Sequence, residues 1–125
     1  MAKALPDAVL DAPLDLIATG TSVSVCSAQP TTRTEAVTTY MLATVTVTPG
    51  DGNGDFTIAN GDTSGRKVTV AEQAAVTITN NGTATHVAIT DASDLLLVTT
   101  CTSQALTAAG TVTIGSFKAE FRDPS

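Results

Sequence analysis

The feature of this sequence that most limits its fold is a repeated alternation of valine or isoleucine with threonine or serine. The alternation recurs in short runs at residues 22–25, 44–48, 68–70, 76–79 and 112–114. Because successive side chains of a β-strand point to opposite faces of its sheet, each run predicts a strand with one buried and one hydrated face. Threonine suits the hydrated face, since its branched side chain fits the pleat while its hydroxyl meets water.

Turn signals separate these runs and indicate the architecture. Residues 80–82 (Asn-Asn-Gly) predict a tight hairpin, because Asn-Gly accepts positive φ, and residues 49–55 and 60–65 read as glycine-rich loops. Residues 95–98 (Leu-Leu-Leu-Val) predict a strand covered on both faces. Several short strands at regular spacing predict a mainly β protein, an antiparallel β-sandwich or a small barrel.

The N-terminal segment carries the only helical pattern. Over residues 5–18, apolar side chains three and four apart form one stripe, made of Leu5, Val9, Ala12 and Leu16. Proline is unfavourable inside a helix but acceptable in a first turn. Asp11 is therefore expected to cap a second segment that contains Pro13 and runs to Ile17, with Gly20 as a stop signal. We expect a short or kinked helix before the β-strands.

Composition excludes several classes of protein. Six basic residues against twelve acidic ones give a net charge of −6, which argues against a nucleic-acid binder. Hydrophobic residues make up 42% and charged residues 14%, so a disordered acidic tail is not expected. No apolar run reaches the roughly 18 residues of a membrane span. Residues 1–7 also lack the apolar stretch of a secretory signal peptide.

The 125 residues are expected to form one soluble β domain. Residues 1–19 would be its helical segment and residues 20–125 its β-sandwich, since no internal repeat or long linker divides the sequence. Aromatic residues make up only 3%, so the core must consist mainly of valine, isoleucine and leucine, with alanine and threonine between them. Association with neighbouring chains would support such a thin core.

Cys26 and Cys101 are the only cysteines, and each lies in a β-like run. Two thiols cannot form a disulfide framework or a zinc site by themselves. We expect two buried free thiols. The alternative is a disulfide, either between these two cysteines or between subunits.

Residues 51–55 (Asp-Gly-Asn-Gly-Asp) resemble the start of a calcium-binding loop, with oxygen ligands at alternate positions. The candidate metal ligands are Asp51, Asn53, Asp55 and Asp62. However, Phe56 stands where such a loop needs glycine, and Asp62 replaces the longer glutamate. A solvated loop is the better interpretation, and neither a metal nor a cofactor is predicted.

No group of residues predicts catalysis. His86 is the only histidine, and no serine or cysteine stands at a spacing that indicates a catalytic triad. Residues 61–67 resemble a phosphate-binding loop only superficially, because three rather than four residues separate the glycines and an arginine precedes the lysine. The chain is therefore expected not to be an enzyme.

In their joint order, several segments resemble a group of small bacteriophage virion structural proteins, of the capsid decoration (cement) or neck and tail accessory type. The matching segments cover most of the chain and lie at residues 7–12, 16–18, 25–32, 61–70, 82–88 and 117–120. Pro13 and the loop at 51–55 depart from the pattern of that group. The resemblance implies a structural component encoded among head and tail genes.

The leading hypothesis is a capsid decoration protein, which binds the outside of the major capsid protein lattice and stabilises the head. One alternative is a neck, collar or tail-fibre component; another is a carbohydrate-binding or adhesin-like β-sandwich, although sugar platforms generally use exposed aromatics. The hypothesis places the chain in the virion, assembled in the cytoplasm of the host bacterium. It would associate as a dimer or trimer and contact other virion proteins, but neither nucleic acid nor a membrane.

A decoration protein needs a stable β scaffold, a face for association and a segment that grips the shell. Residues 2–17 and the loops rich in glycine and aspartate are candidates for the grip. The individual candidates for contact with a partner are Leu5, Val9, Leu16, Arg66, Lys67, Phe117 and Phe121. An acidic, threonine-rich outer surface would keep packed particles soluble.

Overall fold

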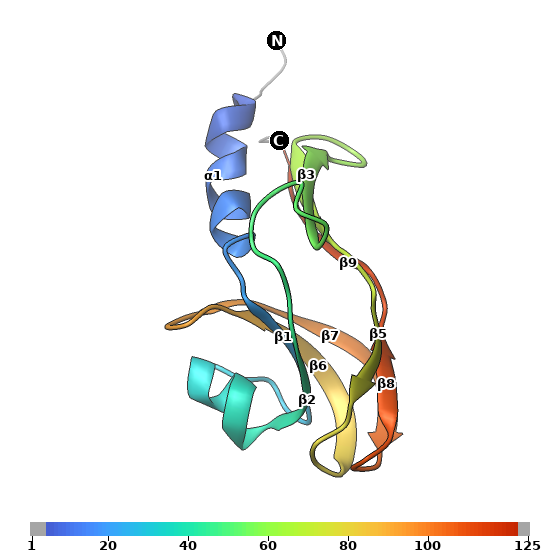
Figure 1. Ribbon diagram of the computed structural model, residues 1–125. Helices are drawn as coiled ribbons and strands as arrows, with labels where there is room; N and C mark the ends of the chain where they lie inside the picture. The colour runs from blue at the N-terminus through green and yellow to red at the C-terminus, as the bar shows by residue number, and fades with distance from the viewer. Residues whose placement is uncertain (1–4, 123–125) are drawn as a thin grey trace.

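The computed structural model describes residues 5–122 and shows a mainly β protein with one short N-terminal α-helix (Figure 1). The elements, in chain order, are α1 (Asp7–Ile17), β1 (Ser22–Cys26), the short π-helix η1 (Glu35–Thr39), β2 (Met41–Thr46), β3 (Phe56–Asn60), β4 (Arg66–Val70), β5 (Gln73–Thr77), β6 (Gly82–Thr90), β7 (Leu95–Leu106), β8 (Thr111–Ile114) and β9 (Phe117–Phe121). The paired strands are antiparallel, which confirms the predicted fold class. No helix in this part of the chain is long and apolar enough to cross a membrane.

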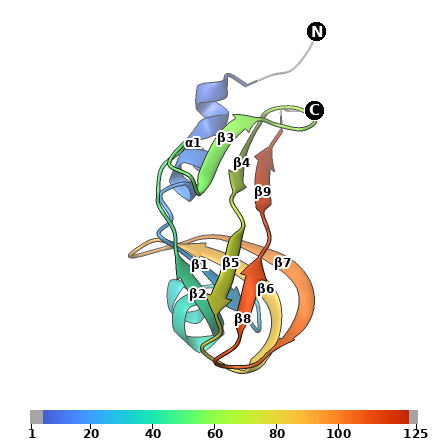
Figure 2. The ribbon, with the colours of Figure 1, turned by 45° about the vertical axis from the view of Figure 1, so that its right-hand side comes forward.

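Three sheets make up the β structure. β2, β1, β6 and β7 pair in that order in a curved four-stranded sheet, and β5 and β8 form a two-stranded sheet that faces it (Figure 2). β3, β4 and β9 form a third sheet, which projects beyond the other two and lies beside α1 (Figure 1). β7 and β8 do not pair with each other, so the described strands do not close into a barrel.

Alternation in the strands separates core residues from the others, as predicted. In β4, Val68 and Val70 are fully buried, while Thr69 between them is only partly buried. The central strand β1 differs, because Ser24 on its second face is also fully buried and exchanges a hydrogen bond with the Thr44 hydroxyl (3.1 Å). The expected hydrated face is therefore wrong for β1, since η1 packs over that side of the sheet.

One apolar core joins the sheets and the helix. Its largest fully buried side chains are Phe56 from β3, Leu14 from α1 and Ile89 from β6. A second, smaller cluster lies beneath η1 and is built around Cys26, Ala36 and Ala88. Within residues 95–98, the two middle side chains pack against the main core and the two outer ones against the smaller cluster. The prediction that this run is covered on both faces is confirmed.

The hairpin predicted at the Asn-Asn-Gly segment is wrong. β5 pairs with β8, and β6 pairs with β1 and β7, so the segment crosses from one sheet to another. Asn80 donates its backbone N–H to the Leu42 carbonyl (3.1 Å) and its side-chain amide to the Met41 carbonyl (2.9 Å). Asn81 Oδ1 accepts a hydrogen bond from the Ala108 N–H (2.7 Å). These asparagines therefore stabilise the connection between the two-stranded and the four-stranded sheet, and they do not form a hairpin turn.

α1 is a single helix, so the second segment expected after Asp11 does not exist. Pro13 lies inside the helix, where it has no N–H to donate to the hydrogen-bond ladder. Asp11 caps nothing and instead pairs with Arg66 of β4. Gly20 is required by close packing, because a Cβ there would stand 2.5 Å from Ile89 Cγ2.

The two sides of α1 should differ in their effect on stability. Leu14 is completely buried, so we expect Leu14→Ala to lower the free energy of unfolding by about 2–5 kcal/mol. Leu16 lies on the same helix with 59% of its surface exposed, and Leu16→Ala should cost less than about 0.5 kcal/mol. Urea unfolding followed by circular dichroism measures both changes, and equal losses would contradict the assigned packing face.

Candidate interaction surface

The outer side of α1 carries an exposed apolar row, made of Val9, Ala12 and Leu16, and Leu5 is exposed just before the helix begins. Leu5 is 40% exposed, Val9 53% and Leu16 59%. Among the described residues, Phe121 of β9 is the only other exposed large hydrophobic side chain. Three of the four residues of the predicted stripe therefore lie on the helix, whereas Leu5 precedes it. They face away from the core, which α1 contacts through its buried leucines and Ile17.

Arg66, a second candidate from the sequence, fastens α1 to β4. Its Nε donates to Asp11 Oδ1 at 2.8 Å, and its Nη1 donates to Asn60 Oδ1 at 2.9 Å. Asp7 lies 3.9 Å away and completes the ion-pair group. The hydrogen bond to Asp11 raises the pKa of Arg66, so the guanidinium stays charged and tied to the helix. Arg66 is thus engaged within the chain, in the contact that joins α1 to β4.

Lys67 is also paired within the chain. Lys67 Nζ lies 2.5 Å from Asp62 Oδ1, and Lys118 of β9 pairs with the other oxygen of the same carboxylate. Glu120 Oε1 lies 3.7 Å from Arg122 Nε. Lys67 and Lys118 therefore share the carboxylate of Asp62, and each basic side chain named here has an acidic neighbour.

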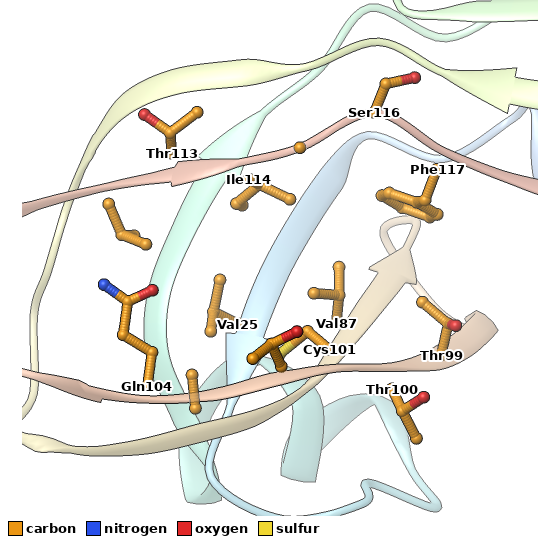
Figure 3. Close-up of a pocket in the computed structure, with 14 residues that line it drawn as sticks. Val25, Val87, Thr99, Thr100, Cys101, Gln104, Thr113, Ile114, Ser116 and Phe117 are labelled. Atoms are coloured by element: carbon orange, nitrogen blue, oxygen red, sulfur yellow. The ribbon is translucent and has the colours of Figure 1, made fainter.

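The two phenylalanines predicted to contact a partner have different environments. Phe117 is half-buried, packs against the main core and points into a cavity between β7 and β8 (Figure 3). Phe121 is 40% exposed and lies opposite Arg66 in the β4–β9 register. Phe121 is therefore at the end of the third sheet that α1 covers, and Phe117 is not.

The candidate metal ligands are not brought together. Asp51 Oδ1 accepts a backbone N–H of β3 at 2.9 Å, and Asp55 Oδ2 accepts another backbone N–H at 2.6 Å. Asn53 donates its amide to a carbonyl of its own loop (2.8 Å), and Asp62 is held by the two lysines. Between residues 5 and 122, no three His, Cys, Asp or Glu side chains gather in a way that could hold a metal ion. Instead, these side chains stabilise the loops through hydrogen bonds and ion pairs.

Both thiols are free, so the alternative of a Cys26–Cys101 disulfide is not formed. Cys26 is fully buried in the small cluster, with its Sγ 3.5 Å from the Ala36 carbonyl. Burial raises the pKa of the Cys26 thiol to about 11, and the nearby Cys101 adds to this. Cys101 packs against the main core and lines the cavity between β7 and β8, and burial raises its pKa as well.

Two features were not anticipated from the sequence. Asp7, Asp11 and Asp15 form an acidic row beside the apolar row, and their spacing of four residues is a signal that the sequence does contain. The cavity between β7 and β8, of about 330 Å³, is lined by side chains from five strands (Figure 3). No local pattern predicts it, because it depends on which strands pair.

Removing the charge that ties α1 to β4 should loosen the helix. We expect Asp11→Asn to accelerate amide hydrogen exchange along α1, because Arg66 loses its closest ion pair. Asp15→Asn removes an exposed aspartate from the same helix and serves as the control. Equal exchange in the two variants would show that the Arg66 contact does not hold the helix.

The buried thiol should make stability depend on pH above neutrality. An unfolded cysteine ionises near pH 9, whereas Cys26 in the folded chain keeps its proton up to about pH 11. The unfolded state therefore loses this proton first, and the free energy of unfolding should fall as the pH rises between these values. Urea unfolding at pH 8, 9, 10 and 11 should show a smaller fall for Cys26→Ala than for the unchanged chain. An identical fall in both would contradict the assignment.

The chain matches no protein-family model, no curated protein and no solved structure. What its surfaces bind must therefore be inferred from their own geometry and chemistry.

Proposed function

We propose that this chain is a non-enzymatic structural protein of a bacteriophage virion, and specifically a decoration protein on the outside of the major capsid protein lattice. The observation that carries the proposal is the exposed apolar row of α1, presented by a helix that is fastened to a β body. The resemblance of the sequence segments to small virion proteins supports the same conclusion.

The apolar row suits permanent attachment to another protein. A leucine or valine that passes from full exposure to full burial contributes about 1.5–3 kcal/mol, and Leu5, Val9 and Leu16 each have roughly half of that surface to bury. The helix behind them is already ordered by Leu14 and Arg66, so little conformational entropy is lost on binding. A dimer or trimer would present several such rows to a lattice at once, which multiplies their effect.

The acidic row indicates the chemistry of the partner. Asp15 is exposed, and Asp7 keeps 68% of its side chain exposed despite its distant contact with Arg66. A partner that buries the apolar row must therefore place basic or hydrogen-bonding groups beside its apolar depression. The proposed site on the capsid protein is an apolar groove with a basic border.

The position on the particle can be tested by counting copies. Mass spectrometry of purified virions of the phage that encodes this chain should find it at a copy number near that of the major capsid protein. A few copies per particle would instead place it at the neck or tail. Virions that lack the chain altogether would overturn the proposal.

The role of the helix needs a separate binding experiment. Capsids assembled without the chain should bind the purified protein, and Val9→Gln with Leu16→Gln should weaken this binding by at least about tenfold. Glutamine is a good helix former, so the helix itself should persist, which circular dichroism checks. Thr77→Gln, an exposed change on β5, is the control. Unchanged binding of the double variant would exclude the apolar row as the contact.

A further inference from the structure

Strand edges expose backbone groups that pair readily with other chains, and three of the edges in the described part of the chain are protected. The free edge of β2 is closed by the Thr79 and Asn80 N–H groups, which both donate to the Leu42 carbonyl (2.7 and 3.1 Å). The edge of β3 is covered by its own loop through Asp51. The edge strand β9 is short and carries charged side chains, which disfavour pairing.

β7 lacks this protection, and β8 has none apart from its shortness. β7 extends over twelve residues, Leu95–Leu106, without a charge or a proline, and it pairs only with β6. β8 (Thr111–Ile114) is also uncharged and pairs only with β5. Across residues 5–122, no backbone group on the other edge of either strand has a hydrogen-bond partner. An unprotected edge of this length is a site for pairing with an added strand.

The two unpaired edges flank the cavity of about 330 Å³ (Figure 3). Val25 and Val87 form its floor, while Ile114 and Phe117 project into it from the opposite wall. Cys101 and Gln104 point into it from β7. None of the residues that line the cavity carries a charge, although the whole chain has a net charge of −6.

A β-bulge shapes the β7 wall. Ala84 lies opposite Gln104, and His86 lies opposite Thr100, so three residues of β7 face the single residue Thr85 of β6. Bulges bend a strand locally and redirect its side chains, often beside binding sites. Here the extra residues include Cys101, whose side chain reaches the cavity.

We propose that the gap between β7 and β8 binds an extended, uncharged peptide segment of another protein, which lies as a single strand between the two edges. A strand in this gap has both of its own edges occupied by β7 and β8. The segment is therefore an arm or a loop, and not part of a sheet in the partner. It is uncharged because the lining offers no counter-charge, and burial of an unpaired charge is costly. This site is separate from the apolar row of α1 and does not depend on the capsid assignment.

Disulfide capture at Cys101 tests the chemistry of the segment. Three probe peptides share the pattern acetyl-Thr-X-Thr-Cys-Thr-X-Thr-amide, with valine, aspartate or lysine at both X positions. The cysteine of each peptide is supplied as its mixed disulfide with 2-mercaptoethanol, so that the Cys101 thiolate attacks the peptide sulfur and 2-mercaptoethanol leaves. Each peptide is equilibrated with the folded protein in a 2-mercaptoethanol buffer. Mass spectrometry then measures the reductant concentration that releases half of the captured peptide. We expect the valine peptide to need about tenfold more reductant than either charged peptide, because several cross-strand pairs add to its retention. Equal retention of the three peptides would overturn the proposal.

Matched variants separate the gap from the thiol. Thr102→Lys places a charge on the exposed wall of the cavity and should abolish the preference for the valine peptide, whereas Thr83→Lys, exposed on β6, should leave it intact. Cys101→Ser should remove capture, since Cys26 is buried.

A readout without the thiol uses amide hydrogen exchange. In Cys101→Ser, excess peptide with valine at X and serine in place of its cysteine should protect amides of both β7 and β8. Protection of neither strand would contradict insertion. The proposal also fails if the chain alone is a dimer with these amides already protected, because the gap would then belong to a second copy.

Discussion

The contact on which the rest of the structure depends lies where α1 passes into β1. At Gly20 the backbone approaches the four-stranded sheet so closely that a Cβ would stand 2.5 Å from Ile89 Cγ2 and 3.3 Å from Phe56 Cζ. Phe56 belongs to β3 of the third sheet, and Ile89 belongs to β6 of the four-stranded sheet, so the two sheets meet at this point. Only 3% of the residues are aromatic, and Phe56 is the one whose ring is fully buried among the described residues. It lies in the core cluster that joins α1, the third sheet and the four-stranded sheet.

The alternation of valine and threonine indicates which face of a strand is buried, but not which strand lies next to it. The strand positions could therefore be predicted from the sequence, whereas the pairing of β5 with β8 could not. The Asn-Asn-Gly segment has the sequence of a hairpin, yet Asn80 and Asn81 bond to β2 and to the turn after β7. These partners are distant in sequence, so no local signal could have revealed the corner.

The helix shows the same limit in another form. Leu5, Val9 and Leu16 have helical spacing, but so do Leu10, Leu14 and Ile17, and periodicity alone does not say which set is buried. The hydrogen bond between Asp11 and Arg66 helps to fix which side of the helix faces β4. Arg66 lies 55 residues later in the chain, so the helical segment itself contains no signal for this contact. The sequence could therefore supply both sets of apolar residues, but neither the choice of the exposed set nor the role of Arg66 as a tether could be predicted from it.

The net charge of −6 favours contacts with neutral or basic partners over acidic ones. The two surfaces without charge, the apolar row of α1 and the gap between β7 and β8, are borne by separate parts of the fold (Figure 1). One is a rigid helix that offers side chains, and the other is a pair of strand edges that offers backbone groups. Because one surface offers side chains and the other offers backbone groups, we propose that the two surfaces engage different partners.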